Sequence, residues 1–234
     1  MHLPEAIESR FRMALEPLVE SATLRFPRLP SPAEALLLLA ACRETGKTVL
    51  WICDGQQSLE RMHRDMSTFV DEPNRSPLYF PALESLLGDK DEPDPRIAGP
   101  RFETLLAACR LDGSPRVVLT CVQALMQKIP PPGELERRTF KLELRAEKPM
   151  ASVTATLEQN GYKFRPEVDI PGSASTRGGI LDVWPVSRNF PTRIEFDGET
   201  VLSIRSFDPA TQRSVEQLES IVIGPATETC GNNP

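Results

Sequence analysis

The sequence Ser175-Thr-Arg-Gly-Gly-Ile-Leu-Asp-Val-Trp-Pro185 lies in a part of the chain where apolar and polar residues alternate. A hydrophobic period of two is typical of β-strands that bury one face. The strands expected from this pattern are Thr139–Arg145, Ile180–Trp184, Arg193–Phe196, Val201–Ser206 and Ile221–Ile223. The pair Asp197-Gly198 predicts a tight turn between two of them. With a helix expected at Ala151–Asn160, this part of the chain is predicted to form a small antiparallel α+β unit.

The amino-terminal half instead alternates helices with buried strands. The strands expected there are Thr48–Cys53 and Val117–Val122, and the helices are Ala33–Arg43, Ser58–Val70, Phe102–Leu111 and Gln123–Lys128. Such an order predicts a parallel sheet with helices on its faces. The stretch Gly88–Pro100 is rich in proline and charge, which predicts a surface loop.

The stretch Pro130–Gly133 predicts the main boundary, because three prolines and a glycine interrupt any regular element. We therefore expect one domain over residues 1–132 and a second over residues 133–228. Residues 229–234 are polar and are expected to form a tail or a linker.

Composition excludes several classes of protein. The formal net charge of −6 disfavours direct nucleic-acid binding, which normally requires a basic surface. The five cysteines are widely spaced and only two histidines accompany them, so we expect buried free thiols and no metal or other cofactor. No apolar run is long enough to span a membrane, and the first residues do not resemble a signal peptide. We expect a cytoplasmic protein without a membrane partner.

The sequence Gly46-Lys47-Thr48 resembles the end of a phosphate-binding loop. A small nucleotide-binding protein or ATPase that uses these residues is therefore the alternative to a non-catalytic protein. The glycine required five positions earlier is replaced by Ala41, and the expected helix precedes the motif instead of following it. We interpret Gly46 as a helix cap and Lys47 as a counter-charge at the end of that helix.

Three sequence blocks carry a resemblance to a known family. They are residues 175–185, Pro191-Thr-Arg-Ile-Glu-Phe-Asp-Gly198 and Ile204-Arg-Ser-Phe-Asp-Pro-Ala-Thr-Gln-Arg-Ser214. In this order and spacing they resemble the second domain of UvrB and of the transcription-repair coupling factor Mfd. That resemblance implies a domain that docks onto the damage-recognition protein UvrA. In the last block, Asp208 and Pro209 also suit a structural turn.

The amino-terminal half is similar to the same family. Residues 80–85 and 99–105 resemble the amino-terminal, UvrB-like region of the coupling factors, in which the nucleotide-binding loop is degenerate. The implied fold class is α/β, with a degenerate nucleotide-fold domain of the P-loop NTPase type followed by the α+β domain. The resemblance implies a non-catalytic interaction module of nucleotide excision repair and transcription-coupled repair, with a UvrA-like partner. The chain is interpreted either as part of a larger Mfd-like chain or as a stand-alone paralogue.

Four residues are expected at the partner-binding surface. The resemblance implies a role in binding UvrA for Arg177 and Arg193, and it places Phe196 and Asp197 in the same surface. Arginine suits such a role because its planar fork pairs with carboxylates at two points. The competing interpretation is that both arginines form intramolecular or surface salt bridges. Asp197 stands where relatives often have a second aromatic residue, so it replaces an apolar contact with a charge.

Overall fold

The computed structural model describes residues 10, 13, 15, 23, 25, 29–70, 76–83, 94–110, 115–131 and 133–228. The chain divides into two compact units, of which the first comprises Met1–Ala82 and Arg110–Lys128. The second comprises Leu83–Cys109 and Ile129–Pro234. The predicted mixed α/β class, with a parallel sheet and antiparallel sheets, is confirmed over the described residues. The expected tail at 229–234 lies outside them.

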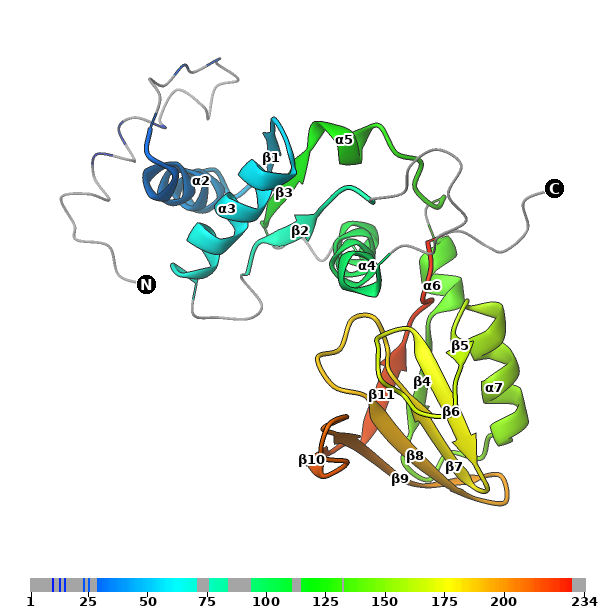
Figure 1. Cartoon of the computed structure of the whole chain (residues 1–234). Coiled ribbons are helices and arrows are strands. Elements are labelled where there is room, and N and C mark those ends of the chain that lie inside the picture. Colours follow the sequence, from blue (N-terminus) through cyan, green and yellow to red (C-terminus); the bar gives the residue numbers. More distant parts are fainter. Residues whose placement is uncertain are drawn as a thin grey trace. The chain divides into compact units, whose positions relative to one another are not determined.

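The first unit contains, over its described residues, a parallel sheet of three strands in the order β1-β3-β2 (Figure 1). Its elements are α2 (Ser31–Thr45), β1 (Val49–Cys53), α3 (Gln56–Ser67), β2 (Leu78–Phe80), β3 (Val117–Cys121) and α5 (Val122–Leu125). Hydrophobic periodicity predicts all of these except β2, which is too short to carry a periodic signal. Helix α3 buries Leu59, Met62 and Met66 on a single face, as an amphipathic helix does.

The second unit is built on a sheet of six strands in the order β10-β9-β8-β7-β6-β5, all within the fully described range 133–228. Its strands are β5 (Lys163–Phe164), β6 (Ser173–Arg177), β7 (Ile180–Val183), β8 (Thr192–Asp197), β9 (Thr200–Phe207) and β10 (Ser214–Gln217). Neighbouring strands are antiparallel except β5 and β6, which are parallel. The sequence predicts β7, β8 and β9, whereas β5, β6 and β10 are found only in the structure.

A hydrophobic core lies against one face of this sheet. The remaining elements of the range are α6 (Glu134–Arg138), β4 (Phe140–Glu143), α7 (Met150–Gln159) and β11 (Ser220–Ile223). Strands β4 and β11 pair with each other in a separate antiparallel ribbon. The core contains buried residues of α7, of the ribbon and of the six-stranded sheet, among them Val153, Leu157, Ile221, Leu181 and Ile194. The expected helix at Ala151–Asn160 is therefore confirmed as the helix of an α+β unit.

Helix α4 (Pro95–Arg110) corrects a prediction, because the described part of the expected loop Gly88–Pro100 is helical from Pro95 onward. Pro95 occupies the first helical position, where a missing amide hydrogen costs no backbone bond. Pro100 lies inside the helix and removes one such bond. The composition of the stretch thus predicts a loop, and packing of α4 against the rest of the second unit offsets that local preference. None of the helices among the described residues has the length and apolar character needed to cross a bilayer.

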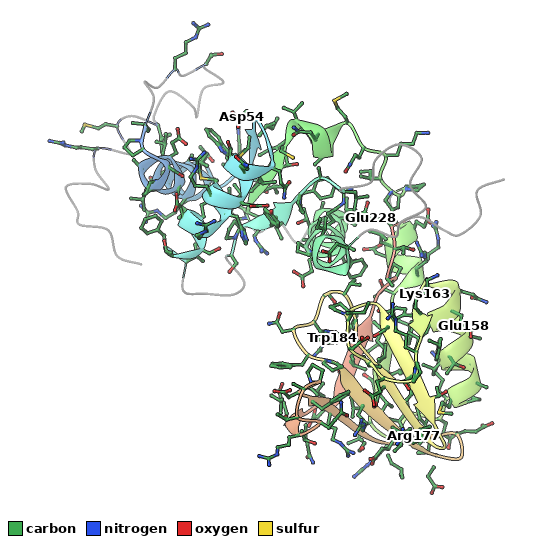
Figure 2. All side chains as sticks on the ribbon, viewed as in Figure 1. Asp54, Glu158, Lys163, Arg177, Trp184 and Glu228 are labelled. Carbon is green, nitrogen blue, oxygen red and sulfur yellow. The ribbon has the colours of Figure 1, made fainter. Side chains whose placement is uncertain are left out.

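Close contacts attach α4 to the rest of the second unit, although the expected division placed residues 83–109 in the first domain. The Arg101 side chain is fully buried, and its Nη2 donates to Glu228 Oε2 at 2.9 Å. Its Nε donates to the second oxygen of the same carboxylate. A β-carbon on Gly99 would lie 2.1 Å from the Val186 carbonyl oxygen, so only glycine fits there. Figure 2 shows Glu228 beside α4.

Replacing Arg101 with methionine is expected to lower the free energy of unfolding of the second unit by about 3 to 5 kcal/mol, because Glu228 would stay buried without its partner. Urea denaturation followed by Trp184 fluorescence in a Trp51→Phe background measures this unit. The control is Arg101→Met combined with Glu228→Leu, which removes both charges and should recover most of the loss. Equal stability of the single variant and the parent chain would contradict the structural role of the ion pair.

Candidate interaction surface of the second unit

Strand alternation places a row of charged residues on the sheet face opposite the core. Leu181, Ile194 and Ile204 are buried in the core. Their neighbours along the strands point to the other face, and we call this set the charged face. It consists of Asp182 of β7, Arg193 and Glu195 of β8, and Arg205 of β9. Asp182 is directly opposite Arg193, and Arg193 is directly opposite Arg205.

Arg193 is held by three other side chains. Its Nε and Nη2 donate to the two carboxylate oxygens of Asp182, both at 2.7 Å. Nη2 also donates to Gln212 Oε1 at 3.1 Å, and the guanidinium carbon lies 4.6 Å from the centre of the Phe207 ring. The side chain of Arg193 is 22% exposed and that of Asp182 is 16% exposed. The hydrogen bonds and charge of Asp182 raise the pKa of Arg193 above its ordinary value.

Glu195 and Arg205 form a second pair on the charged face. Arg205 Nη2 donates to Glu195 Oε1 at 2.6 Å, and Ser203 Oγ donates to Glu195 Oε2 at 2.8 Å. These hydrogen bonds, with that from Arg205 the stronger influence, lower the pKa of Glu195. The charged face therefore presents two neutralised ion pairs whose side chains are already ordered. Neither pair adds net charge to the surface.

Arg177 differs from Arg193 in the exposure and in the pairing of its side chain. It is exposed at the end of β6, where the hairpin to β7 turns through Gly178 with a φ of +58°. Among the described residues, no side chain or backbone group forms a hydrogen bond or an ion pair with its guanidinium. Figure 2 shows it at one end of the sheet, with Trp184 toward the other end. Arg177 thus carries a positive charge that the surrounding chain does not balance.

Phe196 and Asp197 occupy opposite environments although they are adjacent in the sequence. Phe196 is only 9% exposed and belongs to the hydrophobic core, so its ring is not available to a partner. Its backbone amide donates to the Gly179 carbonyl oxygen at 2.8 Å, which ties β8 to the hairpin that carries Arg177. Asp197 is exposed, and the turn at Gly198, with a φ of +59°, is the tight turn that the sequence predicts.

The loop after β9 contains residues that sequence reasoning did not assign to the site. The predicted structural turn is confirmed, because Asp208 Oδ1 accepts hydrogen bonds from the amides of Ala210 and Thr211. Gln212 then adopts a φ of +58° and reaches Arg193. Asp182, Phe207 and Gln212 all contact Arg193, yet each lies at least eleven positions from it. The only available signal was the alternation of strands, which places Asp182 and Arg193 on the same face.

The Gly46-Lys47-Thr48 sequence lies at the carboxyl end of α2. Gly46 is the helix cap, with a φ of +62°, as predicted, and Lys47 is exposed. Carbonyl groups at this end of a helix give it a partial negative charge, which repels phosphate. The strand that follows begins at Val49, so the helix precedes the motif. Among the described residues, no group of three or more His, Cys, Asp or Glu side chains is arranged to hold a metal ion.

The cysteines of the described residues are free thiols, as the sequence predicts. Cys42, Cys53 and Cys121 are buried, whereas Cys109 is half-buried. Burial raises the pKa of Cys53 to about 11, which keeps the thiol protonated at neutral pH. Cys230 lies outside the described residues.

Known proteins are similar to this chain, and the family match lies within the second unit. Residues 140–228 match the model of the UvrB interaction domain. The chain is 28% identical over 200 residues to the transcription-repair-coupling factor of Bacillus subtilis, a match that covers 86% of this chain and 17% of the relative. The corresponding protein of Myxococcus xanthus is 33% identical over 151 residues, covering 64% of this chain and 12% of the relative.

A third relative, from Escherichia coli, is also a transcription-repair-coupling factor. It is 28% identical over 186 residues, covering 80% of this chain and 16% of the relative. The chain therefore spans less than a fifth of the length of these relatives. These comparisons confirm the predicted resemblance: the chain is similar over most of its length to the amino-terminal, UvrB-like region of transcription-repair-coupling factors, and its residues 140–228 are similar to the UvrB interaction domain.

Proposed function

We propose that the chain is a non-catalytic interaction module of nucleotide excision repair and transcription-coupled repair, and that its second unit binds a UvrA-like protein. The match of residues 140–228 to the UvrB interaction domain supports the repair role. The observation that carries the choice of surface is Arg177, an exposed guanidinium without a partner among the described residues. A binding partner that supplies a carboxylate would satisfy it.

The two arginines are proposed to contribute differently. Arg177 supplies a net positive charge, which attracts an acidic partner over a distance and is screened by salt. Arg193 is neutralised by Asp182, so it supplies directed N–H donors and little net charge. Asp197 is proposed to contact the partner from the neighbouring turn. Phe196 is proposed to act indirectly, since its backbone bond to Gly179 fixes the hairpin of Arg177.

The first unit is proposed to be a degenerate nucleotide-fold domain that supports the module without catalysis. Its parallel sheet with flanking helices is compatible with that fold. The position of Gly46 and Lys47 at a helix carboxyl end disfavours phosphate binding there. We also propose that the module acts together with other regions of an Mfd-like chain, because its relatives are much longer. The net charge of −6 keeps direct nucleic-acid binding outside this proposal.

Replacing Arg177 or Arg193 with alanine is expected to weaken binding of cognate UvrA by about tenfold or more, as truncation of interface arginines commonly does. The loss caused by Arg177→Ala should shrink as salt rises, whereas the loss caused by Arg193→Ala should persist. Titration calorimetry at low and high salt measures both. Arg137→Ala, at an exposed arginine of α6 outside the six-stranded sheet, is the matched control.

Two results would contradict the proposal in different ways. If the parent chain does not bind UvrA, the proposed function is wrong. If the parent chain and both arginine variants bind equally, UvrA remains the partner but the chosen surface is wrong. A salt response that is the same for the two variants would contradict the different roles of Arg177 and Arg193.

The nucleotide-binding alternative has its own test. Calorimetric titration with ATP and magnesium at millimolar concentration is expected to give no heat of binding, because Lys47 lies beyond the carboxyl end of α2. Lys47→Ala should behave like the parent chain. Binding of ATP by the parent chain that disappears in Lys47→Ala would instead establish the alternative.

A further inference from the structure

Gln212 has a backbone conformation that side chains rarely adopt. Its φ of +58° is positive, and among the non-glycine residues that the structure describes only Arg145 shares this feature. Its amide donates to the Asp208 carbonyl oxygen at 2.7 Å, which closes the turn after β9. Glycine or asparagine would close the same turn with less strain. The presence of glutamine there needs a reason beyond the turn, and its side chain supplies one.

The side-chain amide of Gln212 is oriented from both ends. Its Nε2 donates to the Pro209 carbonyl oxygen at 3.0 Å. The orientation of the amide group follows from this bond, because only the nitrogen can donate to a carbonyl. The opposite atom, Oε1, then faces Arg193 and accepts from Nη2 at 3.1 Å. The loop thus uses a strained residue to bring one acceptor to one guanidinium.

A count of donors shows what remains available on Arg193. A guanidinium has five N–H groups, one on Nε and two on each terminal nitrogen. Asp182 accepts from Nε and Nη2, and Gln212 accepts from Nη2. The Phe207 ring covers part of the guanidinium plane. Among the described residues nothing accepts from Nη1, so its two N–H groups form the unpaired edge of a fixed side chain.

We propose that Gln212, with Asp182 and Phe207, is a positioning residue that holds Arg193 so that its Nη1 edge meets an acceptor of the partner. This inference rests on the proposed function and deepens it. A free arginine loses rotational freedom when it binds, whereas one that is already immobilised loses little. The three contacts therefore favour association without touching the partner themselves.

The charge around Arg193 also indicates the chemistry of the acceptor. Asp182 neutralises the guanidinium, so the ion pair has little net charge with which to attract a second carboxylate to Nη1. A neutral carbonyl oxygen does not depend on a net positive charge, and it accepts a hydrogen bond from Nη1 with the same geometry as a carboxylate oxygen. We infer that Arg193 Nη1 donates to a carbonyl oxygen of the UvrA-like partner, whereas Arg177 pairs with the carboxylate proposed above.

The test is Gln212→Gly in the full chain, with and without Arg193→Ala, measured by calorimetric titration with cognate UvrA. Glycine relaxes the backbone, so the melting temperature is expected to stay equal or rise. Affinity is expected to fall about fivefold, because the long Arg193 side chain would then have to be immobilised on binding. In the Arg193→Ala background the same change should have no effect. Opposite movement of stability and affinity separates positioning from a merely structural role.

The matched control is Arg145→Gly, which relaxes the other non-glycine residue with a positive φ among those described and should leave affinity unchanged at a salt concentration that screens exposed charges. Unchanged affinity of Gln212→Gly, while Arg193→Ala still weakens binding, would refute the positioning role and leave the proposed function intact. A fivefold loss that persists without Arg193 would show that Gln212 acts by another route. Absence of binding by the parent chain would refute the proposed function, and this inference with it.

Discussion

Burial of one face of the six-stranded sheet is the constraint on which the second unit depends. Leu181 and Ile194 enter the core against α7 and the β4–β11 ribbon. Because successive side chains of a strand point to opposite faces, burying them sends Asp182 and Arg193 outward. The register of β7 and β8 then sets these two side chains directly opposite each other. The same hydrophobic pattern that forms the core thus builds the charged face.

The core and the charged face are also linked through the ends of the strands. Phe196 is a core residue whose backbone holds the hairpin of Arg177, and Phe207 is a buried residue whose ring contacts the Arg193 guanidinium. Each arginine is therefore supported by a buried aromatic residue, Arg177 through the backbone of Phe196 and Arg193 through the ring of Phe207. A surface of this kind loses little flexibility on binding, since its supports are fixed by packing before a partner arrives.

Sequence reasoning was most successful where one local signal was sufficient. Period-two alternation predicted β7, β8 and β9, and the Asp197-Gly198 pair predicted the turn between the last two. Strands β5 and β10 are not predicted, because all their residues are exposed and the sequence therefore shows no alternation of apolar and polar positions. Strand β5 is also only two residues long. The prolines of α4 oppose a helix locally and predict a loop, whereas the packing that offsets them comes from residues more than eighty positions away.

The candidate site was predictable only in part for the same reason. Arg177 and Arg193 were named from sequence, but the partner of Arg193 depends on strand register, and the contact from Gln212 depends on a loop conformation. Phe196 was expected at the partner-binding surface, although alternation from Ile194 already indicated an inward side chain. The resemblance to a family named the residues, while the alternation of the strand decided which of them could face outward.

The attachment of α4 has a consequence for how the protein is made. Arg101 and Glu228 are separated by 127 positions, and residues of the first unit, including β3, lie between them in the chain. On a ribosome, α4 emerges long before the carboxylate that will neutralise its buried arginine. The second unit can close only when synthesis reaches its final residues, and contacts of such long sequence separation form slowly. Until then, Arg101 of α4 lacks the carboxylate of Glu228, and its guanidinium is expected to stay exposed to water.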